Sequence, residues 1–252
     1  MLRQLVVNAD DLGLTVGVND GIFDAHERGI LTSASIFANG PETSDAIQRS
    51  RLHPTLGIGA HLALVDGTPA LPAWQVPTLL TNDGRFHSSW KPFIVACLRG
   101  QISLDEVERE LTTQINRLRQ AGVELTHLDT HKHVHLYPPL FRIVARLAVR
   151  FGIRVVRVPF ERLSAYSIAA GDDHTQRTAR RQAWSNALTW FWALRNYKVA
   201  RSLGLRTPRF MGRIHTGVMS PATLRSLLTA TEPGVTELMV HPGRLDDALR
   251  QV

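Results

Sequence analysis

The chain has 252 residues, of which 44% are hydrophobic and 20% charged, with a formal net charge of +7; these values are typical of a globular protein with one large or two small α/β domains. No apolar run approaches the roughly 20 residues of a membrane-spanning helix, and no signal-peptide pattern precedes the first strand-like segment, so we expect a cytoplasmic protein. The single cysteine, Cys97, excludes an internal disulfide and a cysteine-based zinc site.

Short apolar or β-branched segments alternate with helical patterns along the chain. The predicted strands cover residues 4–10, 30–40, 56–64, 123–131, 153–161, 208–217 and 235–243. The predicted helices cover residues 16–28, 44–52, 103–122, 138–152 and 220–234. Thr15 and Ser220 are predicted N-caps, and Ser103 with Glu106 predicts a capping box. Seven alternations of strand and helix indicate a parallel sheet with helices outside.

The positions of polar side chains favour a closed sheet over an open one. Candidate site residues occur at or just after the C-terminal ends of the predicted strands: Asp10, Asp11, Asn39, His61, His131, Glu161, His215 and His241. In a barrel these ends form one ring, where barrel enzymes have their active sites, whereas an open sheet uses a pair of strands at its switch point. We therefore predict a single α/β domain over residues 1–252, a distorted TIM-like (β/α) barrel, complete or incomplete, with about seven parallel strands.

A cluster of histidines suggests a metal site. His127, His131, His133 and His135 lie within nine residues, and the last three would share one face of an extended segment. Histidine is the commonest metal ligand, and two histidines with one aspartate form an established donor set for a divalent metal. The alternative is a surface run of histidines. For His61, which lies alone in an apolar strand, the alternative is a hydrogen-bonded core histidine.

Five motifs together resemble the YdjC-like family of carbohydrate deacetylases, which includes chitooligosaccharide deacetylases and the hopanoid-linked HpnK branch. They are NADDLG, TSASIFANGP, GIGAHLAL, THLDTHKHVHLYP and ELMVHPG, and they extend from residue 8 to residue 243. The resemblance implies a distorted (β/α) barrel, in agreement with the strand pattern. The corresponding run in the family often has three consecutive histidines; here Lys132 interrupts it, while His131 and His133 keep their places.

The resemblance also implies roles for matching residues. Asp10 matches the general base, Asp11, His61 and His131 match metal ligands, and His241 matches a histidine near the catalytic centre that we interpret as the general acid. Candidates for substrate contacts or for support of the ligands are His127 and His133, which match family positions, and Asn39, His215 and Glu161, which lie at the same end of the predicted barrel.

The implied reaction removes the N-acetyl group from an N-acetylglucosamine-type sugar. A divalent metal lowers the pKa of bound water and polarises the acetyl carbonyl, Asp10 takes the proton of the water, and His241 protonates the leaving amine. The donor set favours zinc, cobalt or manganese on softness grounds, whereas the resemblance implies magnesium. We therefore expect one divalent ion, Mg²⁺ or Zn²⁺, with Co²⁺ and Mn²⁺ as alternatives.

Two other functions use the same residues. A metal phosphoesterase usually needs a second metal, for which His127, His133 and His135 provide ligands. A metal-dependent sugar-binding or lipid-binding protein without catalysis is the non-enzymatic alternative. Two bound ions would favour the phosphoesterase, and one ion would favour the deacetylase.

An Arg/Trp-rich helical insertion is predicted at about 171–207. Trp184, Leu188 and Phe191 recur at helical spacing, and arginines flank them. This apolar face either packs on the barrel or contacts a membrane or lipid tail, because such helices combine basic residues with Trp and Phe. No recognition motif supports nucleic-acid binding.

The insertion looks more like the HpnK branch than the chitooligosaccharide branch. For that branch the expected substrate is an N-acetylglucosaminyl group on a hopanoid lipid, which would bring the protein to the inner membrane surface. Family members often form homodimers, although no motif of this chain indicates one.

Overall fold

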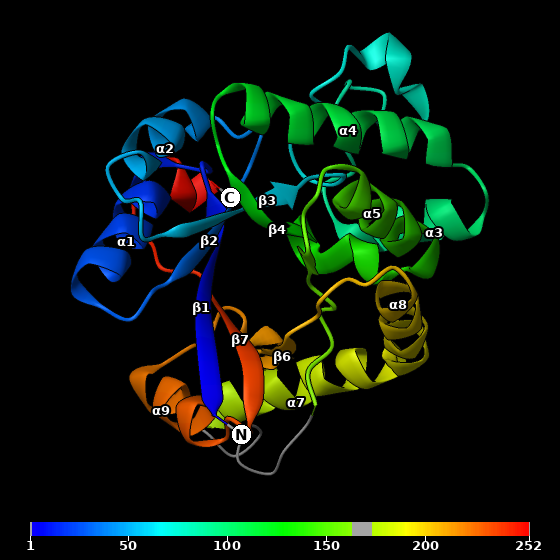
Figure 1. Cartoon of the computed structure of the whole chain (residues 1–252). Coiled ribbons are helices and arrows are strands. Elements are labelled where there is room, and N and C mark those ends of the chain that lie inside the picture. The colour runs from blue at the N-terminus through cyan, green and yellow to red at the C-terminus, as the bar shows by residue number, and fades with distance from the viewer. Residues whose placement is uncertain (1, 163–172, 252) are drawn as a thin grey trace.

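The computed structural model describes residues 2–162 and 173–251, and it consists of a curled parallel sheet surrounded by helices (Figure 1). Seven strands form the sheet in the order β5-β4-β3-β2-β1-β7-β6. Their bounds are β1 (Arg3–Leu12), β2 (Ser33–Ile36), β3 (Gly57–Leu62), β4 (Leu125–Thr130), β5 (Val155–Val156), β6 (Arg209–Met211) and β7 (Gly234–Val240).

The sheet curls and brings its two edges close to each other, but β5 and β6 do not pair as strands. Two isolated parallel bridges, Val155–Arg206 and Glu161–Phe210, join the β5 edge to the β6 edge. The predicted α/β barrel is therefore confirmed in its incomplete form, with seven parallel strands.

The two edge strands are shorter than predicted. Residues 153–161 contribute a strand of two residues, and Pro159, which has no N–H group, cannot continue a ladder of hydrogen bonds beyond it. Residues 208–217 contribute Arg209–Met211, after which Gly212 adopts a left-handed conformation (φ 102°) and a 3₁₀ turn begins. A side chain at Gly212 would lie 2.4 Å from the Met239 carbonyl oxygen, so glycine is required there.

Helices cover the outside of the sheet. The α-helices are α1 (Val16–Arg28), α2 (Thr43–Ser50), α3 (Trp90–Leu98), α4 (Leu104–Gln120), α5 (Pro138–Arg150), α7 (Asp173–Leu188), α8 (Trp190–Ser202) and α9 (Pro221–Thr229). The 3₁₀ turns are η1 (Ala73–Gln75), η2 (Pro77–Leu79), η3 (His131–Leu136), η4 (Arg213–His215) and η5 (Leu249–Gln251). Within the described ranges, none of the helices has the length and apolar character needed to cross a membrane.

The predicted N-caps are confirmed. The hydroxyls of Thr15 and Ser220 accept hydrogen bonds from backbone N–H groups in the first turns of α1 and α9. At α4 the capping box is only half formed: Ser103 Oγ accepts from the Glu106 N–H group, but the Glu106 carboxylate accepts from Thr78 instead of returning to Ser103. The α4 carboxylate therefore anchors the preceding loop.

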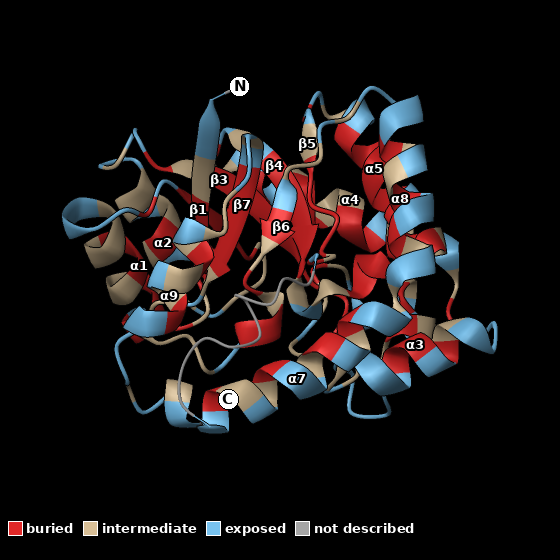
Figure 2. Cartoon of the chain, turned by 90° about the horizontal axis from the view of Figure 1, so that it is seen from below, coloured by how far each residue is buried: buried red, intermediate tan, exposed pale blue. Residues whose placement is uncertain are grey.

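The two faces of the sheet differ in character. Apolar side chains such as Ile22, Leu111 and Phe141 fill the space between the helices and the outer face of the sheet, and Figure 2 shows the buried strands enclosed by helices with exposed outer sides. The inner face carries small or polar side chains. Its buried polar residues include Asn8, Asp10, Ser35, His127, Asp129, Arg157 and Glu237.

The Arg/Trp-rich segment forms two helices, α7 and α8, which Thr189 separates. Both helices pack against their neighbours, α7 against η4 and α8 against α5. The predicted apolar face does not take part in this packing, because Trp184, Leu188 and Phe191 are 75%, 82% and 75% exposed. The buried side of α7 is instead formed by small and polar residues such as Ala179 and Asn186, since these allow close packing. The first residues of the predicted insertion, 171 and 172, lie outside the described residues.

Gly59 of β3 gives a test of the polar interior. A side chain there would lie 2.3 Å from the His127 ring, which hydrogen bonds to Ser35 and Thr126 hold in place. We expect Gly59→Ala to lower the free energy of unfolding by about 1–3 kcal/mol in urea titrations. The His127 ring would have to give up its hydrogen bonds to make room for the new methyl group. Gly57→Ala is the matched control, since its nearest neighbour is 3.6 Å away; equal losses in both variants would contradict this packing.

Candidate metal and catalytic site

Asp10 and Asp11 reach the same cleft because β1 is irregular at its end. Neighbouring side chains of a regular strand point to opposite faces. Here the pairing of β1 with β2 shifts register between Ala9 and Leu12, and Asp11 adopts φ 70°, which is uncommon for a residue other than glycine. Both carboxylates therefore line the cleft at the C-terminal ends of the strands.

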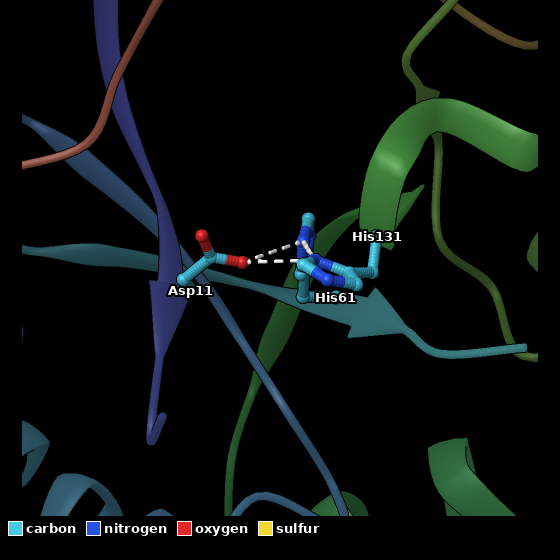
Figure 3. A group of neighbouring side chains, drawn as sticks. All are labelled: Asp11, His61 and His131. Atoms are coloured by element: carbon cyan, nitrogen blue, oxygen red, sulfur yellow. Dashed lines mark hydrogen bonds and ion pairs between the residues drawn. The ribbon is translucent and has the colours of Figure 1, made fainter. Parts of the chain in front are cut away.

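Asp11, His61 and His131 present three donor atoms to one point (Figure 3). Asp11 Oδ1 lies 3.3 Å from His61 Nε2 and 3.0 Å from His131 Nδ1, and these two nitrogens are 3.3 Å apart. Ligand atoms about 2.1 Å from a common metal are roughly 3.0 Å apart in octahedral and 3.4 Å apart in tetrahedral geometry. The spacing and the chemistry of the three donors thus fit a divalent metal.

His61 is oriented by a buried carboxylate. Asp129 Oδ1 lies 2.6 Å from His61 Nδ1, which leaves Nε2 directed toward the other two donors. Burial by itself lowers the pKa of His61, but the charge of Asp129 and the hydrogen bonds with Asp11 and Asp129 raise that pKa to about 10. A metal ligand is a neutral imidazole, so a bound metal would displace this proton.

Asp10, His61 and Asp129 form a second group of potential ligands. The two carboxylates of this group already bind the positively charged side chain of Arg157. Arg157 donates from Nη1 to Asp10 Oδ2 and from Nη2 to Asp10 Oδ1, both at 2.7 Å, and its Nη2 lies 2.9 Å from Asp129 Oδ2. A second dication would face this buried guanidinium at short range, which is electrostatically unfavourable. This arrangement favours a single metal.

The histidine run does not extend the strand. β4 ends at Thr130, and Lys132 and His133 have left-handed backbones (φ 51° and 56°), so the predicted extended face of His131, His133 and His135 is wrong. His135 turns into the core, where its ring nitrogens lie 2.6 Å from Thr130 Oγ1 and 2.8 Å from the Arg157 carbonyl oxygen. Burial lowers the pKa of His133 well below its usual value, which keeps its ring neutral.

The other predicted site residues separate into two groups. Asn39, His133 and His241 line the cleft, and His241 Nε2 is 4.0 Å from Asp11 Oδ2. His127, His215 and Glu161 are buried and do not line it. His127 lies deeper in the barrel, and Glu161 accepts hydrogen bonds from the N–H groups of Gly212 and Ile214, while burial raises its pKa to about 7.

Three residues of the site were not predicted from the sequence. Asp129 precedes His131 by two residues, so the alternation of a strand could have placed both on one face. Arg157 lies in a mostly apolar predicted strand. A charged residue at such a position indicates a buried residue of opposite charge beside it. Asp66, whose carboxylate is 2.6 Å from Lys132 Nζ and 3.8 Å from His131 Nε2, has no such signal because it lies in an irregular loop.

The cleft is large enough to hold a ligand of several hundred Å³. Its volume is about 1300 Å³, and Trp90, Tyr137 and Trp192 are among the residues that line it. A few polar groups within a mostly apolar concave surface are typical of small-molecule sites.

Comparison with known proteins gives the family. Residues 4–252 match the family model described as YdjC-like protein. The chain is 41% identical over 152 residues to a carbohydrate deacetylase of Brevibacillus brevis, an alignment that covers 60% of this chain and 58% of that protein. It is 32% identical over 255 residues to a chitooligosaccharide deacetylase of Salmonella paratyphi C, covering 100% and 86%.

A solved structure has a similar fold. An Enterococcus faecalis protein, provisionally described as a cellobiose-phosphate cleavage protein, superposes with a TM-score of 0.76 at 26% identity, covering 100% of this chain and 85% of that one.

The fold and the site define an incomplete (β/α) barrel with a candidate metal centre at the C-terminal ends of its strands. The chain belongs to the YdjC-like family. The matched region spans 58% and 62% of the carbohydrate deacetylases of Brevibacillus brevis and Halalkalibacterium halodurans.

Asp129→Asn tests the orientation of His61. This substitution replaces the charged partner of His61 Nδ1 with a neutral amide. We therefore expect the affinity for the metal to fall about 10- to 100-fold in titrations of the metal-free protein. Ser35→Ala is the control, because Ser35 Oγ donates to the other oxygen, Asp129 Oδ2, at 2.6 Å. A loss of affinity in Ser35→Ala as large as that in Asp129→Asn would argue against this role.

Proposed function

We propose that the chain removes the N-acetyl group from an amino sugar by metal-dependent hydrolysis. The observation that carries this proposal is the convergence of Asp11, His61 and His131 on one point, with Asp10 beside them in an open cleft. The names of the relatives, carbohydrate deacetylase and chitooligosaccharide deacetylase, support the same reaction and substrate class.

Asp11, His61 and His131 would hold the metal, which when bound would lower the pKa of water and polarise the acetyl carbonyl. Asp10 would receive the proton of the attacking water, because it lines the cleft next to Asp11. Arg157 and Asn8 donate to the Asp10 carboxylate and fix its orientation, while its remaining lone pairs can still accept a proton.

An amine leaves only when it is protonated, so the reaction also needs an acid. His241 lines the same cleft, and its side chain is 36% exposed, so it can meet the substrate and exchange protons with solvent. We assign it as the group that protonates the leaving nitrogen.

The same donor set limits the choice of metal. Two imidazole nitrogens and one carboxylate oxygen suit Zn²⁺, Co²⁺ or Mn²⁺, and Mg²⁺ is the alternative that the family resemblance implies. Within the described residues, none of the extra histidines His127, His133 and His135 belongs to a ligand group, which disfavours the two-metal phosphoesterase.

Replacing each of the adjacent carboxylates separates their roles. We expect Asp11→Asn to lose metal and deacetylase activity together, since it removes an anionic ligand. Asp10→Asn should retain one metal per chain but lose about 100- to 10,000-fold in kcat, the usual contribution of acid–base catalysis. Elemental analysis and acetate release from N,N′-diacetylchitobiose measure the two effects, with exposed Asp105→Asn as control. An Asp10→Asn variant with full activity would refute the base assignment.

We further propose a glycolipid as the natural substrate, at a membrane surface. Trp184, Leu188 and Phe191 form an exposed stripe on α7 and α8, which we call the aromatic stripe. Arg181 and Ser185 of the adjoining helix face line the cleft, so the stripe lies along the cleft rim. Exposed Trp and Phe beside basic residues suit the interface of an anionic membrane, where a lipid-linked N-acetylglucosaminyl group would be presented.

The triple substitution of Trp184, Leu188 and Phe191 by alanine tests this substrate. We expect the wild-type protein to release acetate about 10-fold faster from an N-acetylglucosaminyl lipid in anionic vesicles than from soluble N,N′-diacetylchitobiose, because the stripe binds the vesicle. The triple variant should lose this difference and keep the soluble rate. Trp74→Ala, an equally exposed tryptophan elsewhere, is the control. Rapid soluble turnover without a gain from the lipid would exclude the glycolipid.

A further inference from the structure

A second pocket opens at the opposite end of the barrel from the cleft. Its volume is about 490 Å³, and it is lined by the first residues of several strands, among them Ser33, Val155 and Arg209. It reaches inward to Arg157 and Glu237, because the inner face of the barrel has no layer of large apolar side chains at this level. The Asp10–Arg157 pair therefore lies between the two openings.

Glu237 binds the side of Arg157 that faces away from the cleft. The Arg157 Nε–H donates to Glu237 Oε1 at 2.7 Å, and Nη2 lies 2.6 Å from the same oxygen. The other edge of the guanidinium makes the two-pronged contact with Asp10. A planar guanidinium held on both edges cannot rotate, so Glu237 sets the angle at which Arg157 meets Asp10.

The surroundings of Glu237 are strongly charged. Asp10 of β1, Asp129 and His127 of β4, and Arg157 after β5 face it inside the barrel, and the side chains of Arg206 and Arg209 lie at the pocket mouth. Burial raises the pKa of Glu237 to about 7, although Arg157 opposes this shift. Without the Glu237 carboxylate, the buried Arg157 Nε–H group would lose its hydrogen-bond partner.

We propose that Glu237 is a positioning residue that acts on Asp10 through Arg157, and that removal of the Glu237 side chain leaves a space in the second pocket, next to Arg157, that a small carboxylate anion can fill. The first part rests on the proposed function, in which Asp10 is the base. Glu237 does not line the cleft, so its loss is expected to change kcat and not KM.

Glu237→Ala tests both parts. With N,N′-diacetylchitobiose we expect kcat to fall about 10- to 100-fold, as a small misplacement of a catalytic group does, with KM unchanged. Sodium formate should restore kcat saturably, since its carboxylate can accept from Arg157 Nε, whereas sodium chloride at equal ionic strength should not. Glu237→Gln, which keeps an acceptor oxygen at this place, should retain most of the rate.

The control is Glu232→Ala, which removes the exposed partner of Arg209 at the pocket mouth, 2.7 Å from Arg209 Nη1. It should have the wild-type rate and no response to formate. A wild-type kcat in Glu237→Ala, an equal loss in Glu237→Gln, or restoration by chloride would overturn the positioning role.

Thermal unfolding separates this inference from the proposed function. Formate should raise the melting temperature of Glu237→Ala and leave that of the wild-type protein unchanged, whatever the reaction is. If formate raises the melting temperature of Glu237→Ala but the wild-type protein releases no acetate, the deacetylase proposal is refuted and the carboxylate site is supported. Wild-type acetate release without the shift would refute the site alone.

Discussion

The buried guanidinium of Arg157 links the fold to the candidate site. Its side chain is 1% exposed, and burying such a charge costs several kcal/mol unless partners compensate. Three carboxylates, Asp10, Asp129 and Glu237, supply that compensation from β1, β4 and β7. The same contacts hold three strands in register around the barrel axis, so the stability of the interior and the geometry of the site depend on one set of charges.

Three carboxylates surround the single guanidinium, so this part of the interior has an excess of negative charge. That excess also acts on the metal donors. Asp129 divides its two oxygens between Arg157 and His61, so the orientation of a proposed ligand depends on the same ion pair that holds the strands. The remaining negative charge raises the pKa of His61, which means that the site attracts positive charge, whether a proton or a metal. These buried charges fit only into a barrel interior that is lined by small and polar residues. Gly59 is one of the small residues, and its missing side chain leaves room for the His127 ring.

The sequence predicted the incomplete barrel because its strands and helices alternate with clear start and stop signals. The convergence of parallel strand ends in a barrel placed Asp11, His61 and His131 among the candidates, and the family resemblance singled them out as ligands; the structure brings these three residues together. The sequence could not predict the partners of Arg157, which come from strands far apart in the chain.

The local errors have physical causes too. The left-handed conformations of Lys132 and His133 carry no propensity signal, and they turn a predicted extended face into a 3₁₀ segment. Trp184 points outward because the opposite side of α7 packs against the rest of the protein. Small residues such as Ala179 form that packed side.

Two adjacent carboxylates serve different cations because a single backbone conformation separates them. Asp10 continues the alternation of β1 and points to Arg157 inside the barrel. The left-handed φ of Asp11 turns the next side chain toward His61 and His131 instead of the helix layer. Each carboxylate thus has its own positive partner, which removes the cost of placing two like charges side by side in a buried site. A regular strand at this point would direct one of them into the apolar layer, where no positive group could compensate it.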